Sequence, residues 1–186
     1  SIYHAAIRTN GTLWIWSAIP QTENTNVMKK PTPVKDLYHV KSVSMSDRSI
    51  LALTESGSIW GTIDSNNYNE VTMSKMPGLT DIVSVQTKNG FNLVANKKGE
   101  YWVWKAGTSL QGLQKITAVK SISKLTLDLG NFVAVKKDGT VWTWSTQPTT
   151  DNRLVFTQPK LIKGLSDPVS FAKGENSKVC SPEGWY

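Results

Sequence analysis

Residue types that support catalysis or metal binding are few in this sequence of 186 residues. Its two histidines, His4 and His39, have no Cys, Asp or Glu nearby at the spacing of metal ligands. The single cysteine, Cys180, follows the apolar Val179, a context that favours a buried and unreactive thiol. One cysteine also excludes an internal disulfide and a multi-cysteine metal site. We therefore expect no metal ion and no cofactor.

The acidic residues show no catalytic pattern either. Asp36, Asp47, Asp64, Asp81 and Asp151 are scattered through segments predicted to be loops, and no motif pairs two of them as a glycosidase requires. The sequence has no Gly-x-Ser-x-Gly elbow, no Gly-rich phosphate loop and no Rossmann fingerprint. We therefore expect no enzymatic activity; an active site assembled in a central channel is the rival hypothesis.

Basic residues recur at matching places in the sequence. Arg8, Lys97 with Lys98, and Lys136 with Lys137 lie at three turns that contain glycine. The formal net charge of +7 favours acidic partners. A protein is the expected partner, and a polyanion or a glycan is the next. Nucleic acid ranks below protein because the aromatic residues are not spaced as stacking platforms for bases.

A repeated Gly-x-x-Trp pattern predicts the elements that position these side chains. Its copies are Gly11/Trp14, Gly57/Trp60, Gly99/Trp102 and Gly139/Trp142, with glycines 46, 42 and 40 residues apart. This spacing is typical of β-propeller blades. The Trp-bearing strands are apolar on both faces, so both faces must be covered, as they are between blades. The sequence predicts an all-β fold: a β-propeller of about four to five short blades, or a partial, open propeller.

Each copy predicts a hairpin preceded by a short strand. The strands before the turns cover residues 3–7, 49–53, 91–95, 131–135 and, in a weaker fifth copy, 176–180. Those after the turns cover 12–16, 58–60, 100–104 and 140–144. Asn10-Gly11 and Asp138-Gly139 predict two-residue primed turns. The leading strands are predicted at 40–45 and 82–86, and we expect the tryptophans to hold the blades together rather than to bind sugars.

Aligned on these glycines, the repeats resemble those of the regulator of chromosome condensation family. The best copies run from Pro33 to Gly61, from Pro77 to Trp104, and from Val119 to Trp144. The family's strand histidine is replaced in every copy, so the nucleotide-exchange and nucleosome-binding roles of its namesake carry over to no residue here. The sequence is more similar to divergent bacterial propellers of the family, some of which are extracellular. That resemblance implies a secreted or cell-surface bacterial protein.

We predict one repeat domain over residues 1–186. Its repeats cover approximately 1–16 (partial), 31–62, 77–104, 115–144 and 159–186 (incomplete). The segments 19–30, 64–75 and 146–157 differ most between copies and are the predicted contact loops, because binding residues gather on loops held by a rigid scaffold. Tyr68, Arg153 and Phe156 are their candidate anchors.

The leading interpretation is a non-catalytic binding module that recognises another macromolecule, with protein ranked first, through loops on one propeller rim. One alternative is a carbohydrate-binding propeller lectin, which predicts an equivalent pocket with an exposed aromatic residue in each blade. A second alternative is a structural segment of a larger surface protein or toxin. No stretch of roughly 18 apolar residues occurs, so we expect no membrane span. An open propeller would expose edge strands and so favour self-association.

Overall fold

The computed structural model describes residues 2–22, 25–46, 49–62, 71–108, 110–166 and 168. Within these ranges the regular elements are seventeen strands and one turn of 3-10 helix, η1 (Leu110–Gly112). No helix in the described part of the chain has the length and apolar character to cross a membrane. The predicted all-β class is confirmed.

The strands form four antiparallel sheets, numbered I to IV in chain order. Sheet I contains β1 (Ile2–Ile7), β2 (Leu13–Thr22) and β3 (Thr25–Met28), and β4 (Thr32–Pro33) also pairs with β2. Sheet II contains β5 (Val40–Ser46), β6 (Ser49–Thr54), β7 (Ile59–Thr62) and β8 (Met73–Lys75). Sheet III contains β9 (Ile82–Lys88), β10 (Phe91–Asn96), β11 (Tyr101–Lys105) and β12 (Gln114–Lys115). Sheet IV contains β13 (Ile122–Asp128), β14 (Asn131–Lys136), β15 (Thr140–Pro148) and β16 (Leu154–Phe156), and β17 (Lys160–Ser166) also pairs with β15.

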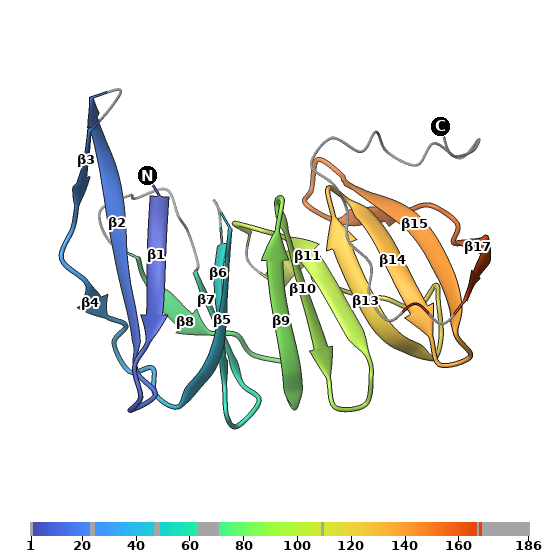
Figure 1. Cartoon of the computed structure of the whole chain (residues 1–186), viewed down its shortest axis with the longest axis horizontal. Coiled ribbons are helices and arrows are strands. Elements are labelled where there is room, and N and C mark those ends of the chain that lie inside the picture. Colours follow the sequence, from blue (N-terminus) through green and yellow to red (C-terminus); the bar gives the residue numbers. More distant parts are fainter. Residues whose placement is uncertain are drawn as a thin grey trace.

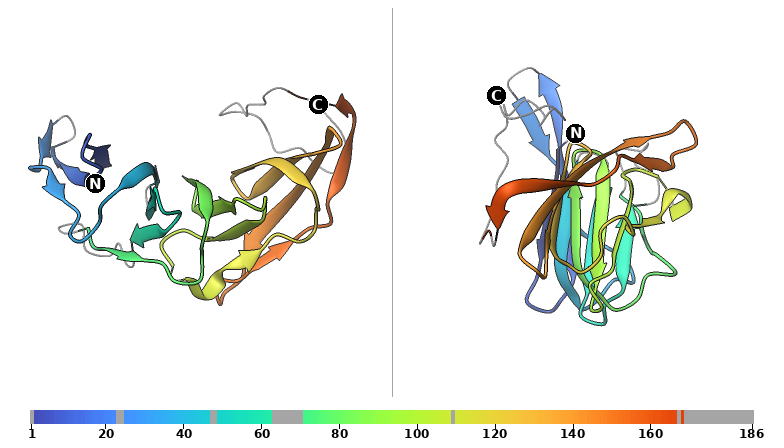
Figure 2. Two further views of the ribbon diagram at one scale, coloured as in Figure 1. Left: turned by 90° about the horizontal axis from the view of Figure 1, so that it is seen from below. Right: turned by 90° about the vertical axis from the view of Figure 1, so that its right-hand side faces the viewer.

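The four sheets follow one another along an arc, each facing the next (Figure 1). Seen from below, the arc is open, and sheets I and IV are held apart at its two ends (Figure 2, left). Among the described strands, none joins one end of the arc to the other. The prediction of a partial, open propeller is therefore confirmed.

The predicted hairpin strands are present in all four sheets, and the leading strands are β5 and β9. The sheets are nevertheless out of phase with the sequence repeats. The outer strand of each sheet comes from the segment at or just before the start of the next repeat: Trp14 pairs with Pro33, Trp60 with Lys75, and Trp102 with Lys115. The chain therefore passes from the outer strand of one sheet directly into the strands of the next. The weaker fifth copy lies outside the described residues.

The predicted turn type is wrong at the repeat glycines. Arg8 N donates to Thr12 O (3.0 Å) and Gly11 N donates to Arg8 O (2.9 Å), so the loop has three residues and not two. Only its last residue, Gly11, has a positive φ (76°), whereas a two-residue turn needs positive φ at both positions in type I′ and at the first in type II′. Two-residue turns instead join β9 to β10 and β13 to β14, where Asn89-Gly90 and Leu129-Gly130 have positive φ throughout.

The core is divided among the three junctions between neighbouring sheets. At the junction of sheets II and III, Trp104 packs with Leu51, Leu53 and Ile59. At the junction of sheets III and IV, Trp144 packs with Leu93 and Val103. Trp104 is 0% exposed and Trp144 is 3% exposed, so these two tryptophans hold neighbouring sheets together as predicted. Burial of such aromatic residues dominates the stabilisation of an interface of this kind.

Candidate interaction surface

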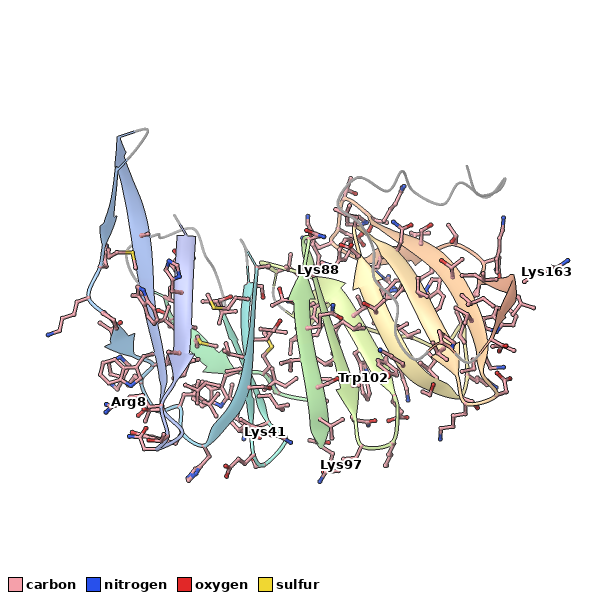
Figure 3. All side chains as sticks on the ribbon, in the orientation of Figure 1. Arg8, Lys41, Lys88, Lys97, Trp102 and Lys163 are labelled. Atoms are coloured by element: carbon pink, nitrogen blue, oxygen red, sulfur yellow. The ribbon has the colours of Figure 1, made fainter. Side chains whose placement is uncertain are left out.

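The three basic turns lie on one rim of the arc. They join β1 to β2, β10 to β11 and β14 to β15, and the equivalent hairpin of each sheet points to the lower edge in Figure 1. Figure 3 shows Arg8, Lys41 and Lys97 along that edge, and Lys88 toward the opposite one. Arg8, Lys97, Lys98 and Lys137 are exposed, and Lys136 is half-buried. We call these five residues the basic rim.

Backbone hydrogen bonds hold the tips in place. Lys97 N donates to Asp81 O (3.0 Å) and Lys137 N donates to Ser121 O (2.8 Å), so each tip is tied to the residue before its own leading strand. The glycine of one sheet also contacts the next, because Ile82 N donates to Gly57 O (3.1 Å). The basic side chains therefore project from a backbone with few remaining degrees of freedom.

These anchor residues were not predicted from the sequence. His39, Asp81 and Ser121 occupy the same place before β5, β9 and β13, and their φ angles are 54°, 55° and 58°. Residues other than glycine rarely adopt this left-handed conformation. The only available signal was their position directly before Val40, Ile82 and Ile122 in three aligned copies.

Cations lie over the first tryptophan of three copies. The Arg8 guanidinium is 5.5 Å from the Trp14 ring centroid, and the Lys136 amine is 5.8 Å from that of Trp142. Lys115, which sequence reasoning missed, lies 5.5 Å from the Trp102 centroid and also pairs with Glu100. Attraction between a cation and an aromatic face contributes about 0.5–1 kcal/mol at exposed sites. The charged groups of Arg8 and Lys136 are thus held close to the tryptophan rings of their own sheets.

Two of the five rim cations are paired with acids. Lys97 lies 3.5 Å from Asp81, and Lys136 lies 2.9 Å from Asp138. Among the described residues, no ion pair involves Lys98 or Lys137. The tip of sheet II is acidic, because Glu55 stands where the third copy has Lys97. The positive rim is therefore strongest over sheets III and IV and is interrupted at sheet II.

A short hydrogen-bond relay orders the tip of sheet IV. Asp138 accepts from the Thr140 hydroxyl (2.6 Å) and the Thr140 amide (3.0 Å), and Trp142 Nε1 donates to Thr140 Oγ1 (3.1 Å). The Thr140 hydroxyl and, next, the Lys136 amine lower the pKa of Asp138 to about 2. Asp138 is therefore ionised at neutral pH and offsets one lysine.

The remaining candidate residues do not join the basic rim. Because β15 starts at that rim, the loop after its end at Pro148 lies on the opposite side, and Arg153 is exposed there. Phe156 packs against the core, with its ring 6.0 Å from that of Phe132, so it contributes to the sheet junction rather than to an exposed surface. Tyr68 lies outside the described residues, as does Cys180.

The long hairpin between β15 and β16 packs on the preceding sheet. The Gln114 side-chain amide donates to Leu154 O (3.0 Å) and accepts from Leu154 N (2.5 Å). Both backbone polar groups of Leu154 are thus bonded by one side chain, as a neighbouring strand would bond them. Lys105 Nζ donates to Asn152 Oδ1 (3.1 Å). Part of the predicted contact loop 146–157 therefore has a structural role.

The described residues contain no group of three or more His, Cys, Asp or Glu side chains that could hold a metal ion. His4 stacks on Trp16, with centroids 5.5 Å apart, and the His39 ring lies 3.9 Å from the Glu55 carboxylate at an exposed position. Both histidines have contacts that account for them without a ligand.

Comparisons with known proteins identify the fold. No protein-family model matches this chain. Protein pim1 of Schizosaccharomyces pombe is 28% identical over 136 aligned residues, which cover 55% of this chain and 25% of that protein. The crystal structure of Prp20p from Saccharomyces cerevisiae superposes with a TM-score of 0.61 at 10% identity, over 88% of this chain and 50% of that one. Human WBSCR16 gives a TM-score of 0.54 at 14% identity, over 77% of this chain and 45% of that one.

The fold is therefore that of an RCC1-like β-propeller, which confirms the resemblance found in the repeats. At 10% and 14% identity, these structures are informative about the fold alone. The chain spans about a quarter of the length of pim1 and about half the length of Prp20p.

Proposed function

We propose that this chain is a non-catalytic binding module that recognises an acidic face of another protein through the basic rim. The observation that carries the proposal is the convergence of three basic tips, from three different sheets, on one edge of the arc. Their backbone is fixed before binding, so little conformational entropy would be lost when a partner docks. Lys98 and Lys137 are the rim residues best suited to contact it, because both are exposed and neither takes part in an ion pair within the described structure.

Proteins of the same fold support a protein as the partner. The published description of Prp20p names binding to Gsp1p and to histones, and a second crystal structure contains Kap60 bound to yeast RCC1 (Prp20). Those partners belong to that protein. For this chain they favour protein recognition over catalysis, in keeping with the absence of a catalytic motif in its sequence.

A glycan-binding lectin is less well supported. That function predicts one equivalent pocket in each sheet, and the loops that would form the pockets differ between copies in length and sequence. A polyanion would use the same lysines as an acidic protein and is separated from it by experiment. A structural segment of a larger surface protein or toxin would need no charged rim.

Charge reversal tests the proposal. The test variant carries Lys97→Glu, Lys98→Glu and Lys137→Glu and leaves Lys136 in place, because that amine lies over Trp142. Each substitution changes the net charge by two, so the variant has a charge of +1 in place of +7. The matched control carries Lys30→Glu, Lys88→Glu and Lys163→Glu, three exposed positions outside the tips with the same change in charge, and Lys88 lies toward the opposite edge (Figure 3).

The wild type, the test variant and the control are compared in capture from extracts of the source organism and in retention on heparin. We expect the test variant alone to lose capture, and wild-type capture to weaken as salt rises from about 50 mM to about 500 mM, because screening shortens the range of charge interactions. Equal loss in both variants would indicate a net-charge effect and contradict the rim. Retention on heparin without capture of any protein would identify a polyanion as the ligand.

A further inference from the structure

The tip of sheet II breaks the pattern of the basic rim. Glu55 stands at the place that Lys97 has in sheet III and Lys137 has in sheet IV. The Glu55 side chain is 70% exposed, and its one ion contact within the described residues is with His39. The 3.9 Å between Glu55 Oε2 and His39 Nδ1 is too long for a hydrogen bond. An exposed carboxylate therefore interrupts the row of cations.

An exposed tyrosine accompanies this acid. Tyr38 is 60% exposed, and it precedes His39, whose carbonyl oxygen accepts a hydrogen bond from Glu55 N (2.9 Å). The side chains of Tyr38 and Glu55 thus leave the backbone at neighbouring, hydrogen-bonded places. The residues aligned with Tyr38 are Thr80 in sheet III and Lys120 in sheet IV, and both are exposed. Sheet II therefore differs from sheet IV at two aligned positions, with an acid and an aromatic residue in place of two lysines.

The segment that carries Tyr38 is held on both sides. Leu37 is 1% exposed and packs with Leu13 in the junction of sheets I and II. On the other side, Val40 N donates to Gly11 O (2.9 Å). The position of the tyrosine is therefore fixed before binding, and little backbone entropy would be lost when its ring is contacted. Exposed tyrosines held in this way are typical hot spots of protein interfaces.

The other charges near this tip do not pair with Glu55. Lys35 and Asp36 are both exposed and are opposite in sign. Lys41 lies on β5 where the register shifts between Val40 and Ser42, and Figure 3 shows it at the same edge. Among the described residues, no ion pair joins it to Glu55. A ligand that crosses the rim therefore meets a carboxylate at the tip of sheet II.

An exposed aromatic ring beside an exposed carboxylate is suited to a cation. A guanidinium group stacks on the face of a tyrosine ring, and its fork of N–H donors matches the two oxygens of a carboxylate. The phosphate or sulfate groups of a polyanion would instead be repelled by Glu55. The chemistry at sheet II is thus opposite to that at Lys98 and Lys137, although the hairpins point to the same edge of the arc (Figure 1).

We propose that Tyr38 and Glu55 form a specificity site that binds a cationic side chain, preferentially arginine, of the protein partner. This inference rests on the proposed function of the basic rim and adds a charge pattern to the partner. Its acidic residues lie opposite sheets III and IV, and its cation lies opposite sheet II. A uniformly negative ligand lacks that cation, so the site discriminates against nucleic acids and other polyanions.

Synthetic peptides of one length test the charge pattern. Facing sheets lie about 10 Å apart, and an extended chain covers about 3.3–3.6 Å per residue, so about three residues span neighbouring tips. Each peptide carries two pairs of glutamates three residues apart. Three residues further along, it carries arginine, glutamine or glutamate, and the peptides differ at this position alone. Their dissociation constants for the whole chain are measured by fluorescence anisotropy at about 50 mM salt, where screening is weak.

We expect the arginine peptide to bind the wild type most tightly and the glutamate peptide least tightly. The arginine peptide should bind about two- to fivefold more tightly than the glutamine peptide, as an exposed contact between a cation and an aromatic ring allows. A rim that only attracts negative charge would give the reverse order, because the glutamate peptide is the most acidic. Tyr38→Ala should reduce the preference for arginine, and Glu55→Lys should reverse the order.

Asp151→Lys is the matched control for Glu55→Lys. Asp151 is exposed in the loop after β15, on the side opposite the rim, and its substitution changes the net charge by the same amount. This control should keep the wild-type order of the three peptides. On heparin, Glu55→Lys should elute at higher salt than Asp151→Lys, because only the first removes a carboxylate from the rim. Equal elution of the two variants would contradict discrimination against polyanions.

A second comparison separates this inference from the proposed function. If the wild type binds the three peptides equally or in the reverse order, the specificity site is wrong. The basic rim would still stand in that case if Lys98→Glu with Lys137→Glu weakened the binding of all three. If that double variant binds every peptide as the wild type does, the rim is wrong and the specificity site is overturned with it.

Discussion

Substituting the repeat glycine at position 57 should destabilise the protein more than a glycine of the same conformation elsewhere. Gly57 has a φ of 79°, and a Cβ atom there would lie 3.1 Å from both Asp81 Cα and Ile82 N. These are backbone atoms of the next sheet, and Ile82 N also donates its hydrogen bond to Gly57 O. The backbone at Asp81 and Ile82 therefore cannot move away from Gly57 without losing this hydrogen bond.

Gly78 supplies the matched control. Its φ is 81°, and a Cβ atom at that position would meet nothing within 4 Å. Gly78→Ala should cost about 1 kcal/mol, because left-handed strain of about 1–2 kcal/mol is partly offset by the lower entropy of the unfolded chain. Gly57→Ala bears the same strain and a further 1–3 kcal/mol, roughly, for the displaced backbone. The expected difference between the two variants is thus about 1–3 kcal/mol.

Urea unfolding followed by tryptophan fluorescence measures this difference, provided that the slope of the free energy of unfolding against urea is the same in both variants. Gly11→Ala should behave like Gly57→Ala, because its Cβ would lie 3.0 Å from His39 Cα. Equal losses for Gly57→Ala and Gly78→Ala would refute the reasoning. In that case glycine would be required only for the conformation of the turn, and its close approach to the next sheet would not affect the free energy of unfolding.

Three further outcomes follow from single contacts. Leu129→Asn should raise the free energy of unfolding by about 0.5–1 kcal/mol in a thermal melt, because Leu129 is 61% exposed with a φ of 48° and asparagine tolerates that conformation better. The pKa of Asp138 is lowered to about 2 in the folded protein, so its stabilising effect is present above its ordinary pKa and is lost as pH falls toward 2. The melting temperatures of the wild type and Asp138→Asn should accordingly converge between about pH 4 and pH 2, and a gap that stays constant would contradict the relay. Gln114→Ala should cost about 1–3 kcal/mol and speed hydrogen exchange at the Leu154 amide, whereas unchanged exchange would show that the side-chain pair does not hold the hairpin.

Much of the fold could be predicted because the relevant interactions are local. The strands on either side of Gly57 and Gly99 follow from short apolar runs with a left-handed residue between them. The turn at Gly11 was predicted with the wrong length, since the Asn-Gly pair is common to two kinds of loop. The pairing of Arg8 with Thr12 decides between them, and it depends on the register of the whole hairpin.

The candidate surface could be predicted only in part. Equivalent positions in a propeller share a rim, so the common location of Lys97 and Lys137 followed from their alignment. The ion pair between Lys97 and Asp81 spans two turns separated along the chain, and nothing in either turn indicates it. Phe156 was predicted as a candidate anchor of a contact loop, and its packing on Phe132 depends on how a long hairpin folds over its own sheet.

The sequence by itself determined the strands, the glycine turns and the period that arranges them as propeller sheets, because these depend on backbone conformation and on alternation of side chains within a few residues. Only the tertiary structure decided which sheet faces are covered. Trp16 and Trp104 occupy the same place in the same local pattern, yet one is half-buried and the other is 0% exposed. The physical reason is that burial of a sheet face depends on its neighbour. The neighbour comes from another repeat, and at the open ends of the arc none is present within the described chain.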